Sequence, residues 1–242
     1  MFTLKNSQPI KMKKLILIIL VLCFQNTTFS QTLDEKIISY TVDLNQEEIK
    51  LYLKDSAENP ISNAGDLLKL EDNLVLVMNG GMYQSDQSPQ GLYIQESKLI
   101  KRTNKVQNAY GNFYMQPNGV FYIQNDTPKV VQTSVLKLDS NISYATQSGP
   151  MLVIKGEIHS KFMEGSKNLN IRNGVGILPN GDVLFAISKE KINFFDFATF
   201  FKNKGCKNAL YLDGFVSRAY IPSKNWAQLD GRFGVLIGVI KK

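Results

Sequence analysis

Short runs of alternating apolar and polar residues, separated by turn residues, are the feature that most limits the fold of this 242-residue chain. A period of two is typical of half-buried β-strands, and an Asn-Gly pair between two such runs is a strong hairpin signal. Two pairs with flanking runs are present: Asn118-Gly119 between 113–115 and 120–123, and Asn180-Gly181 between 175–178 and 183–187. The chain is therefore predicted to form mainly antiparallel sheet.

Further strands are predicted by alternation toward both ends of the chain. Runs 37–42 and 49–53 are joined by a polar segment, which indicates that they form an antiparallel pair. Runs 74–78 and 233–240 are apolar enough to be buried strands. These segments leave few places for long helices.

One helix is clearly predicted, over 193–205. Asn193 can cap its N-terminus, and Gly205 can end it. Phe194, Phe197, Ala198 and Phe201 share one face at helical spacing, so this face is expected to be core. A short helix is also possible over 66–70. The predicted class is α+β: a single domain with a predominantly antiparallel or mixed β-sheet and a few packed helices.

The first thirty residues have the pattern of a secretory signal peptide. Three lysines, Lys11, Lys13 and Lys14, precede the apolar run 15–24, and small residues lie one and three positions before Gln31. A membrane span needs about 20 apolar residues, and this run has half that length. We expect residues 1–30 to be removed, residues 31–242 to form the domain, and the product to be periplasmic or extracellular without stable membrane insertion.

Composition excludes several function classes. The chain has 28 basic and 21 acidic residues, and four of the lysines lie in residues 1–30, so the net charge falls from +7 to +3 without that segment. This gives no reason to expect a nucleic-acid partner. Residues 31–242 then contain one cysteine, Cys206, and one histidine, His159. A single cysteine disfavours a disulfide or a thiolate metal site, and a single histidine disfavours a two-histidine metal site and a serine triad. No metal or cofactor is expected, and Cys206 is interpreted as core.

The run 209–212 delivers Asp213-Gly214 at the predicted end of a buried strand. An acid there would be held by the core yet open to solvent, as a catalytic carboxylate needs. The alternative is that Asp213 simply begins a tight turn. Two other glycine-bearing turns follow strands, at 79–83 and 147–150, and their backbone N–H groups could bind an anion. Arg172 could clamp a phosphate or carboxylate, or be an ordinary surface arginine.

Taken together and in order, these motifs resemble the phosphodiester glycosidase (NAGPA-like) family, from about residue 74 to the C-terminus. The motifs are Asn79-Gly80-Gly81-Met82-Tyr83, Ser148-Gly149-Pro150, Arg172 before Gly176-Ile177, and Leu212-Asp213-Gly214. Residues 209–218 look especially like the YigE-type bacterial branch. The resemblance implies an α+β domain that cleaves a sugar-1-phosphodiester, by analogy with the mammalian uncovering enzyme. That enzyme's pattern has further glycines where this chain has Phe215-Val216, so the natural substrate should not be transferred.

The reaction implied by the resemblance assigns roles to named residues. Phosphate is a good leaving group, so one carboxylate with anion clamps can suffice where ordinary glycoside hydrolysis uses two carboxylates. The expected catalytic residues are Asp213 as nucleophile or base, Arg172 as phosphate clamp and Glu164 as a proton-transfer group. The expected substrate-binding residues are Asn79, Gly80, Gly81, Tyr83, Ser148, Gly149, Gly214, Ser217, Arg218 and His159. Glu164 and His159 lie on a polar loop, where the alternative is that they are merely solvated.

Two other functions stay open from the sequence. A non-catalytic glycan or cell-envelope binding module would account for the many aromatic residues and for Phe215-Val216. A metal-assisted phosphodiesterase could use Asp213 with Asp86 or Asp230, although these acids show no ligand spacing. The preferred hypothesis is an exported glycosidase whose partner is a sugar phosphate or glycan-containing small molecule.

Overall fold

The computed structural model describes residues 33–213 and 216–242. The predicted signal peptide and the predicted site residue Gly214 lie outside this part of the chain. Among the described residues, no helix is both long and apolar enough to cross a membrane.

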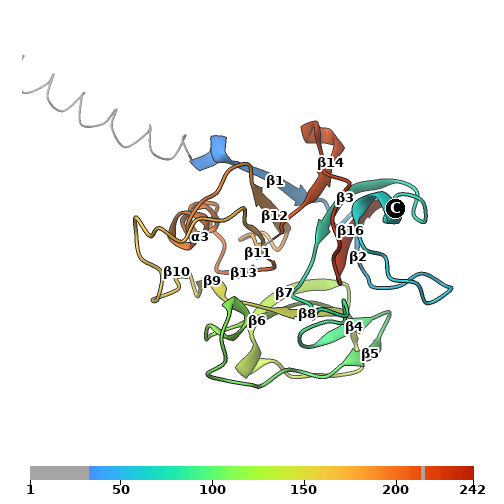
Figure 1. Ribbon diagram of the computed structural model, residues 1–242, viewed down its shortest axis with the longest axis horizontal. Coiled ribbons are helices and arrows are strands. Elements are labelled where there is room, and N and C mark those ends of the chain that lie inside the picture. The colour runs from blue at the N-terminus through green and yellow to red at the C-terminus, as the bar shows by residue number, and fades with distance from the viewer. Residues whose placement is uncertain (1–32, 214–215) are drawn as a thin grey trace, which may run out of the picture. The chain divides into compact units, whose positions relative to one another are not determined.

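Three sheets, all with antiparallel pairing, make up the unit Ile37–Lys242 (Figure 1). The first has the order β1 (Ile37–Val42), β12 (Val183–Ser188), β11 (Asn173–Ile177), β13 (Asn208–Tyr211), β9 (Met151–Ile154) and β10 (Glu157–Ile158). The second has β15 (Trp226–Ala227), β14 (Ala219–Ile221), β3 (Leu74–Asn79), β16 (Leu236–Lys241) and β2 (Glu47–Tyr52). The third has β5 (Lys98–Lys101), β4 (Tyr93–Gln95), β8 (Ile142–Ser148), β6 (Gly119–Gln124) and β7 (Thr127–Gln132).

Helices are few and short. In the described ranges, besides the helical residues 33–36, they are α2 (Ala64–Leu67), α3 (Phe194–Asn203) and the 3-10 turns η1 (Asn112–Tyr114), η2 (Thr133–Val135) and η3 (Pro222–Lys224). As predicted, the Asn193 side chain caps α3 by accepting from the backbone N–H of Asp196, and Gly205 follows its end with a φ of 85°. The predicted α+β class with mainly antiparallel sheet is confirmed.

A central core joins the three sheets. Phe121 from β6 and Phe185 from β12 are fully buried and meet edge to face, with ring centroids 5.9 Å apart. Leu76 from β3 belongs to the same cluster. Truncating a core phenylalanine to alanine costs about 3–5 kcal/mol, so this junction is a major source of stability. The aromatic face of α3 packs separately against β9 and β13, as its spacing predicted.

Two predicted strand pairings are wrong. The runs 37–42 and 49–53 form strands, but β1 pairs with β12 and β2 pairs with β16. Residues 113 and 114 belong to the 3-10 turn η1 and 115 follows it, so Asn118-Gly119 joins no hairpin. Gly119 is needed there for close packing, because a Cβ would lie 2.3 Å from Met151 Sδ. The second hairpin prediction is confirmed, since β11 and β12 pair directly across the 179–182 turn.

Candidate active site

Strand ends from the first two sheets meet around the side chain of Asn79, the last residue of β3. Its Nδ2 donates to Asp213 Oδ2 at 2.9 Å, while its Oδ1 accepts from the backbone N–H of Arg218 at 2.9 Å. Asn173, at the start of β11, donates to Asn79 O at 2.7 Å and accepts from the N–H of Asp213 at 2.9 Å. Asn79 and Asn173 are buried, so these bonds hold Asp213 from both its backbone and its side chain.

Asp213 reaches a pocket of about 400 Å³. The residue is 7% exposed and directly follows Leu212 after β13, as expected for an acid delivered by a buried strand. The other lining residues are Met82, Tyr83, Gln84, Ser85, Gln90, Tyr110, Gly111, Asn112, Phe113, Tyr114 and Val216. The pocket lining thus combines one carboxylate with amides, hydroxyls and aromatic rings.

Two tyrosines shape this pocket. Tyr83 Oη donates to the Arg232 carbonyl at 2.9 Å, and Gln90 Nε2 donates to Tyr114 Oη at 2.7 Å. Burial, and then the charge of Asp213, raises the pKa of Tyr83 to about 12. Tyr83 is therefore protonated at neutral pH.

Arg172 lies inside the protein and does not line the Asp213 pocket. Its Nε donates to Ile192 O at 2.9 Å, its Nη2 to Asn168 O at 2.8 Å and its Nη1 to Tyr211 Oη at 3.2 Å. The guanidinium carbon lies 3.6 Å from the ring centroid of Phe194. Burial lowers the pKa of Arg172, with the Tyr211 hydroxyl opposing that shift. These contacts place the guanidinium as a support for Tyr211, two residues before Asp213.

Arg218 contacts the site through its backbone N–H, and Ser217 contacts it through its hydroxyl. The Arg218 guanidinium forms a two-bond pair with Asp230, at 3.0 and 3.2 Å, while its N–H binds Asn79. Ser217 is fully buried, and its hydroxyl donates to the Asp213 carbonyl. Neither side chain lines the pocket among the described residues. Their contacts instead hold the Asp213 segment in place.

The predicted glycines are sites of close packing. A Cβ on Gly80 would lie 2.4 Å from Ile237, one on Gly81 would lie 2.3 Å from Thr146, and one on Gly149 would lie 2.6 Å from Asn118. The N–H of Gly80 is already bound to Val235 O at 2.8 Å. Ser148 is buried, and its hydroxyl donates to the carbonyl of Leu212. These residues join β3 and β8 to the Asp213 segment.

His159 and Glu164 lie apart from the pocket lining. His159 is 2% exposed; its Nε2 lies 3.1 Å from Gln116 O, and its Nδ1 accepts from the N–H of Lys161. Its ring stacks on Phe162, which in turn stacks on Phe194. Glu164 is exposed on the loop between β10 and β11. The structure therefore does not bring these two residues to Asp213.

The acids of the metal-assisted alternative also have other partners. Asp86 accepts from the N–H and hydroxyl of Ser88 within its own turn, and Asp230 pairs with Arg218. In the described ranges 33–213 and 216–242, no group of three His, Cys, Asp or Glu side chains is placed to hold a metal ion.

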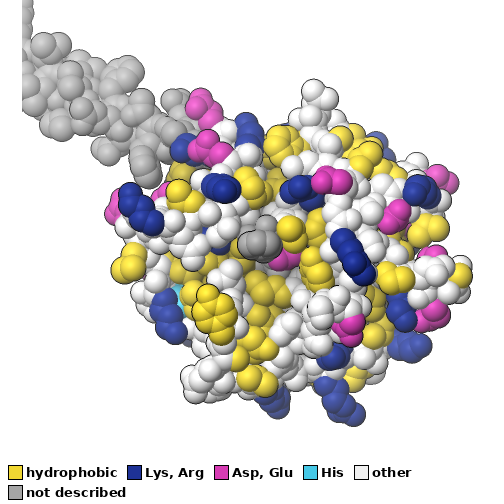
Figure 2. Space-filling model, in the orientation of Figure 1, with side chains coloured by type: hydrophobic (Ala, Val, Ile, Leu, Met, Phe, Trp, Pro, Cys, Tyr) yellow, Lys and Arg dark blue, Asp and Glu magenta, His cyan; other side chains and the backbone are white. Residues whose placement is uncertain are grey.

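Several residues of the site were not singled out from the sequence. Asn173 is the clearest example of such a residue. Its only signal in the sequence is that it is a polar residue at the start of an otherwise apolar strand. Gln90 reaches the pocket from a loop, and Asn112 and Tyr114 reach it from the 3-10 turn η1, whose folding no local pattern predicts. Charged side chains lie mainly around the rim of the face drawn in Figure 2, with apolar and uncharged polar side chains toward its middle.

Fold and site together define a mainly antiparallel β protein with a buried amide cluster holding one carboxylate at a pocket. Residues 72–233 match the phosphodiester glycosidase (NAGPA) family. The chain is 34% identical over 187 residues to the uncharacterized protein YigE of Escherichia coli (strain K12), covering 76% of this chain and 73% of that protein. The chain therefore belongs to the phosphodiester glycosidase family.

Solved structures share this fold. The catalytic domain of zebrafish N-acetylglucosamine-1-phosphodiester α-N-acetylglucosaminidase, auto-inhibited by its pro-peptide, matches with a TM-score of 0.61 at 16% identity, over 85% of this chain and 82% of that one. A putative exported protein from Burkholderia pseudomallei K96243 matches with a TM-score of 0.56 at 10% identity, over 84% and 73%. A hypothetical protein from Synechocystis matches with a TM-score of 0.53 at 12% identity, over 85% and 59%.

Proposed function

We propose that this protein is an exported glycosidase that hydrolyses a sugar-1-phosphodiester. The observation that carries the proposal is the Asp213 carboxylate, held by Asn79 at the wall of a pocket of about 400 Å³. Membership of the phosphodiester glycosidase family supports the reaction class. The zebrafish protein with the same fold is named for the cleavage of such a diester.

In the proposed reaction, the bond between the anomeric carbon and the phosphate oxygen breaks, and the phosphate leaves with the electron pair. Because phosphate is a stable anion, it needs little help from a general acid. Asp213 either takes a proton from the attacking water or attacks the anomeric carbon itself, forming an ester that water then hydrolyses. The first route inverts the anomeric configuration and the second retains it, so the anomer of the product distinguishes them.

The phosphate contacts in this proposal differ from the arginine clamp expected from the sequence. Among the described residues, the pocket lining contains no lysine or arginine. Amide and hydroxyl donors of Gln84, Ser85 and Asn112 would therefore meet the substrate's oxygens. Neutral hydrogen-bond donors that point to the position where charge develops can stabilise that charge.

Asp213→Asn tests the proposal, because it keeps the size of the side chain and removes its charge. We expect a fall in turnover of a hexose-1-phosphodiester by about a hundredfold or more, measured as released reducing sugar. Asp72→Asn, an exposed acid before β3, is the matched control and should act like the unaltered protein. Equal rates for Asp213→Asn and the unaltered protein would refute the assigned role.

The binding-module alternative predicts a different result. Glycan binding without turnover, unaffected by Asp213→Asn, would favour it over the glycosidase.

Export is tested separately by mass spectrometry of the protein recovered from outside the cytoplasm. An N-terminus near Gln31 is expected, and an intact Met1 or Met12 would contradict the proposed removal of the leader.

A further inference from the structure

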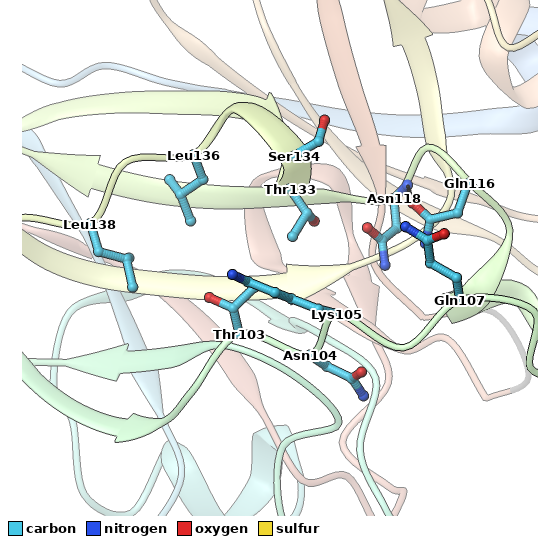
Figure 3. Close-up of a pocket in the computed structure, with 10 residues that line it drawn as sticks. All are labelled: Thr103, Asn104, Lys105, Gln107, Gln116, Asn118, Thr133, Ser134, Leu136 and Leu138. Carbon is cyan, nitrogen blue, oxygen red and sulfur yellow. Dashed lines mark hydrogen bonds between the residues drawn. The ribbon is translucent and has the colours of Figure 1, made fainter.

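A second cavity, of about 490 Å³, lies beside the loop that lines the Asp213 pocket (Figure 3). Two segments that flank η1 form one wall, and residues at and after η2 form the other. The lining residues are Thr103, Asn104, Lys105, Gln107, Gln116, Asn118, Thr133, Ser134, Leu136 and Leu138. The intervening residues 110–114 line the Asp213 pocket instead. One loop therefore borders both cavities.

The loop is fixed to the third sheet by the side chain of Gln147, which is 1% exposed. Its Oε1 accepts from the N–H of Asn104 at 2.9 Å, and its Nε2 donates to the carbonyl of Asn104 at 2.8 Å. Oε1 also accepts from the N–H of Leu92 at 3.0 Å. Gly91 makes room for this amide, because a Cβ there would lie 2.3 Å from Gln147 Oε1. The cavity wall near Asn104 is therefore anchored rather than free.

The opposite wall is anchored through Asn118, which is 2% exposed. Its side-chain Nδ2 donates to Phe113 O at 3.0 Å, and its backbone carbonyl accepts from the N–H of Thr133 at 3.0 Å. Gln116 Oε1 accepts from the N–H of Asn118 at 3.3 Å. The amide groups of Gln116 and Asn118 are thus held by the backbone around them, which lowers the entropy lost when a ligand binds.

The chemistry of the lining is uneven along the cavity. Gln107, Gln116 and Asn118 gather at one end in Figure 3, while the Lys105 side chain runs away from them, toward the side on which Leu138 lies. Amides both donate and accept, as sugar hydroxyls require, and an ammonium group binds an anion. No acidic residue is among the ten lining residues, so nothing in the lining opposes a negative charge.

We propose that this cavity is a second saccharide site, which binds a sugar unit carrying a negative charge such as a phosphate. The amides Gln107 and Gln116 contact its hydroxyls, and Lys105 contacts the anion. This deepens the proposed function and rests on it: the substrate is then an oligomer of charged sugar units, with one unit in the Asp213 pocket and another across the loop.

Residue-resolved binding tests the proposal without requiring turnover. Backbone amide shifts of Asp213→Asn protein are followed by NMR during titration with α-glucose 1-phosphate, methyl α-glucoside or inorganic phosphate. We expect saturable shifts at Lys105, Gln107 and Thr133 with α-glucose 1-phosphate. Methyl α-glucoside and inorganic phosphate should each bind at least tenfold more weakly. Lys105→Gln should weaken this binding about tenfold, because it removes one charge-assisted contact.

Lys137→Gln is the matched control, since Lys137 is exposed between Leu136 and Leu138 and does not line the cavity. It should leave the affinity unchanged. Equal weakening by both lysine variants would overturn the proposal, as would equally tight binding of inorganic phosphate or shifts confined to Tyr83 and Gln84. Because this readout is binding at named residues, failure of the glycosidase proposal in the turnover assay would be seen separately.

Discussion

Asn79 donates a hydrogen bond of 2.9 Å to the carboxylate of Asp213, which lies 134 residues later in the chain. The orientation of the Asn79 amide is set by its other contacts, because its oxygen accepts from the N–H of Arg218 and from Asn173 Nδ2. A reversed amide would place its NH₂ group against both donors. The donor facing Asp213 is thus fixed by the surrounding network before any ligand arrives.

Asn79→Ala is expected to lower both stability and activity. The substitution leaves the buried N–H of Arg218 without its acceptor and removes the longer of the two hydrogen bonds of Asn173 Nδ2, which costs about 1–3 kcal/mol in the free energy of unfolding. Turnover should fall further than stability explains, because Asp213 also loses a donor. Urea unfolding and initial rates measure the two effects. Asn141→Ala, at an exposed turn, is the control, and unchanged stability of Asn79→Ala would contradict the network.

Arg172→Lys is expected to destabilise the fold. Lysine cannot reproduce the fork that binds Ile192 O, Asn168 O and Tyr211 Oη, nor the flat stacking on Phe194. We expect a loss of about 2–4 kcal/mol in the free energy of unfolding. Arg218→Lys changes a partly exposed pair with Asp230 and should cost at most about 1 kcal/mol. If Arg172 held the phosphate directly, its lysine variant would instead keep its stability and raise KM.

His159 is expected to make the protein less stable in mild acid. Burial is the main cause that lowers the pKa of His159 below 6.5, and the nearby Lys161 adds to it. Below about pH 6.5 His159 binds a proton in the unfolded chain but not in the folded chain. The free energy of unfolding therefore decreases as the pH is lowered, until the pKa of His159 in the folded protein is reached. Urea unfolding at pH 7.5 and pH 5 should show this fall, and His159→Gln should reduce it. An equal fall in both proteins would contradict this origin.

Local patterns in the sequence predicted the strands and the main helix well. Alternation of Ile49, Lys50 and Leu51 and the face shared by Phe197 and Phe201 follow from burial on one side, which each segment records by itself. Partner choice is a long-range property, so alternation could not show that β2 pairs with β16. Gly119 was misread for a related reason: glycine serves close packing as well as turns, and the atom that it approaches lies on another strand.

The site was predictable where a strand delivers a residue and unpredictable where loops meet. Asp213 was expected at the end of a buried strand, and it lies there. The burial of Arg172 could not be seen, because its partners Ile192, Asn168 and Tyr211 come from three different segments. Residues that line one cavity also lie far apart in the sequence. The segment 103–118 borders two cavities, and the other walls of both cavities come from distant segments.

Cys206 is expected to react only when the protein unfolds. The thiol is 1% exposed, and a Cβ on Gly176 would lie 2.7 Å from its sulfur, so no reagent can approach it in the folded state. Burial also raises the pKa of Cys206 to about 12, and the reactive thiolate is scarce at pH 8. Iodoacetamide labelling of folded protein, located by mass spectrometry, should be at least a hundredfold slower than in urea, where the thiol regains an ordinary pKa near 8.5. Fast labelling without urea would show that the packing between α3 and β11 opens readily, and the aromatic face of α3 would then be a weaker support for the strand leading to Asp213 than its burial indicates.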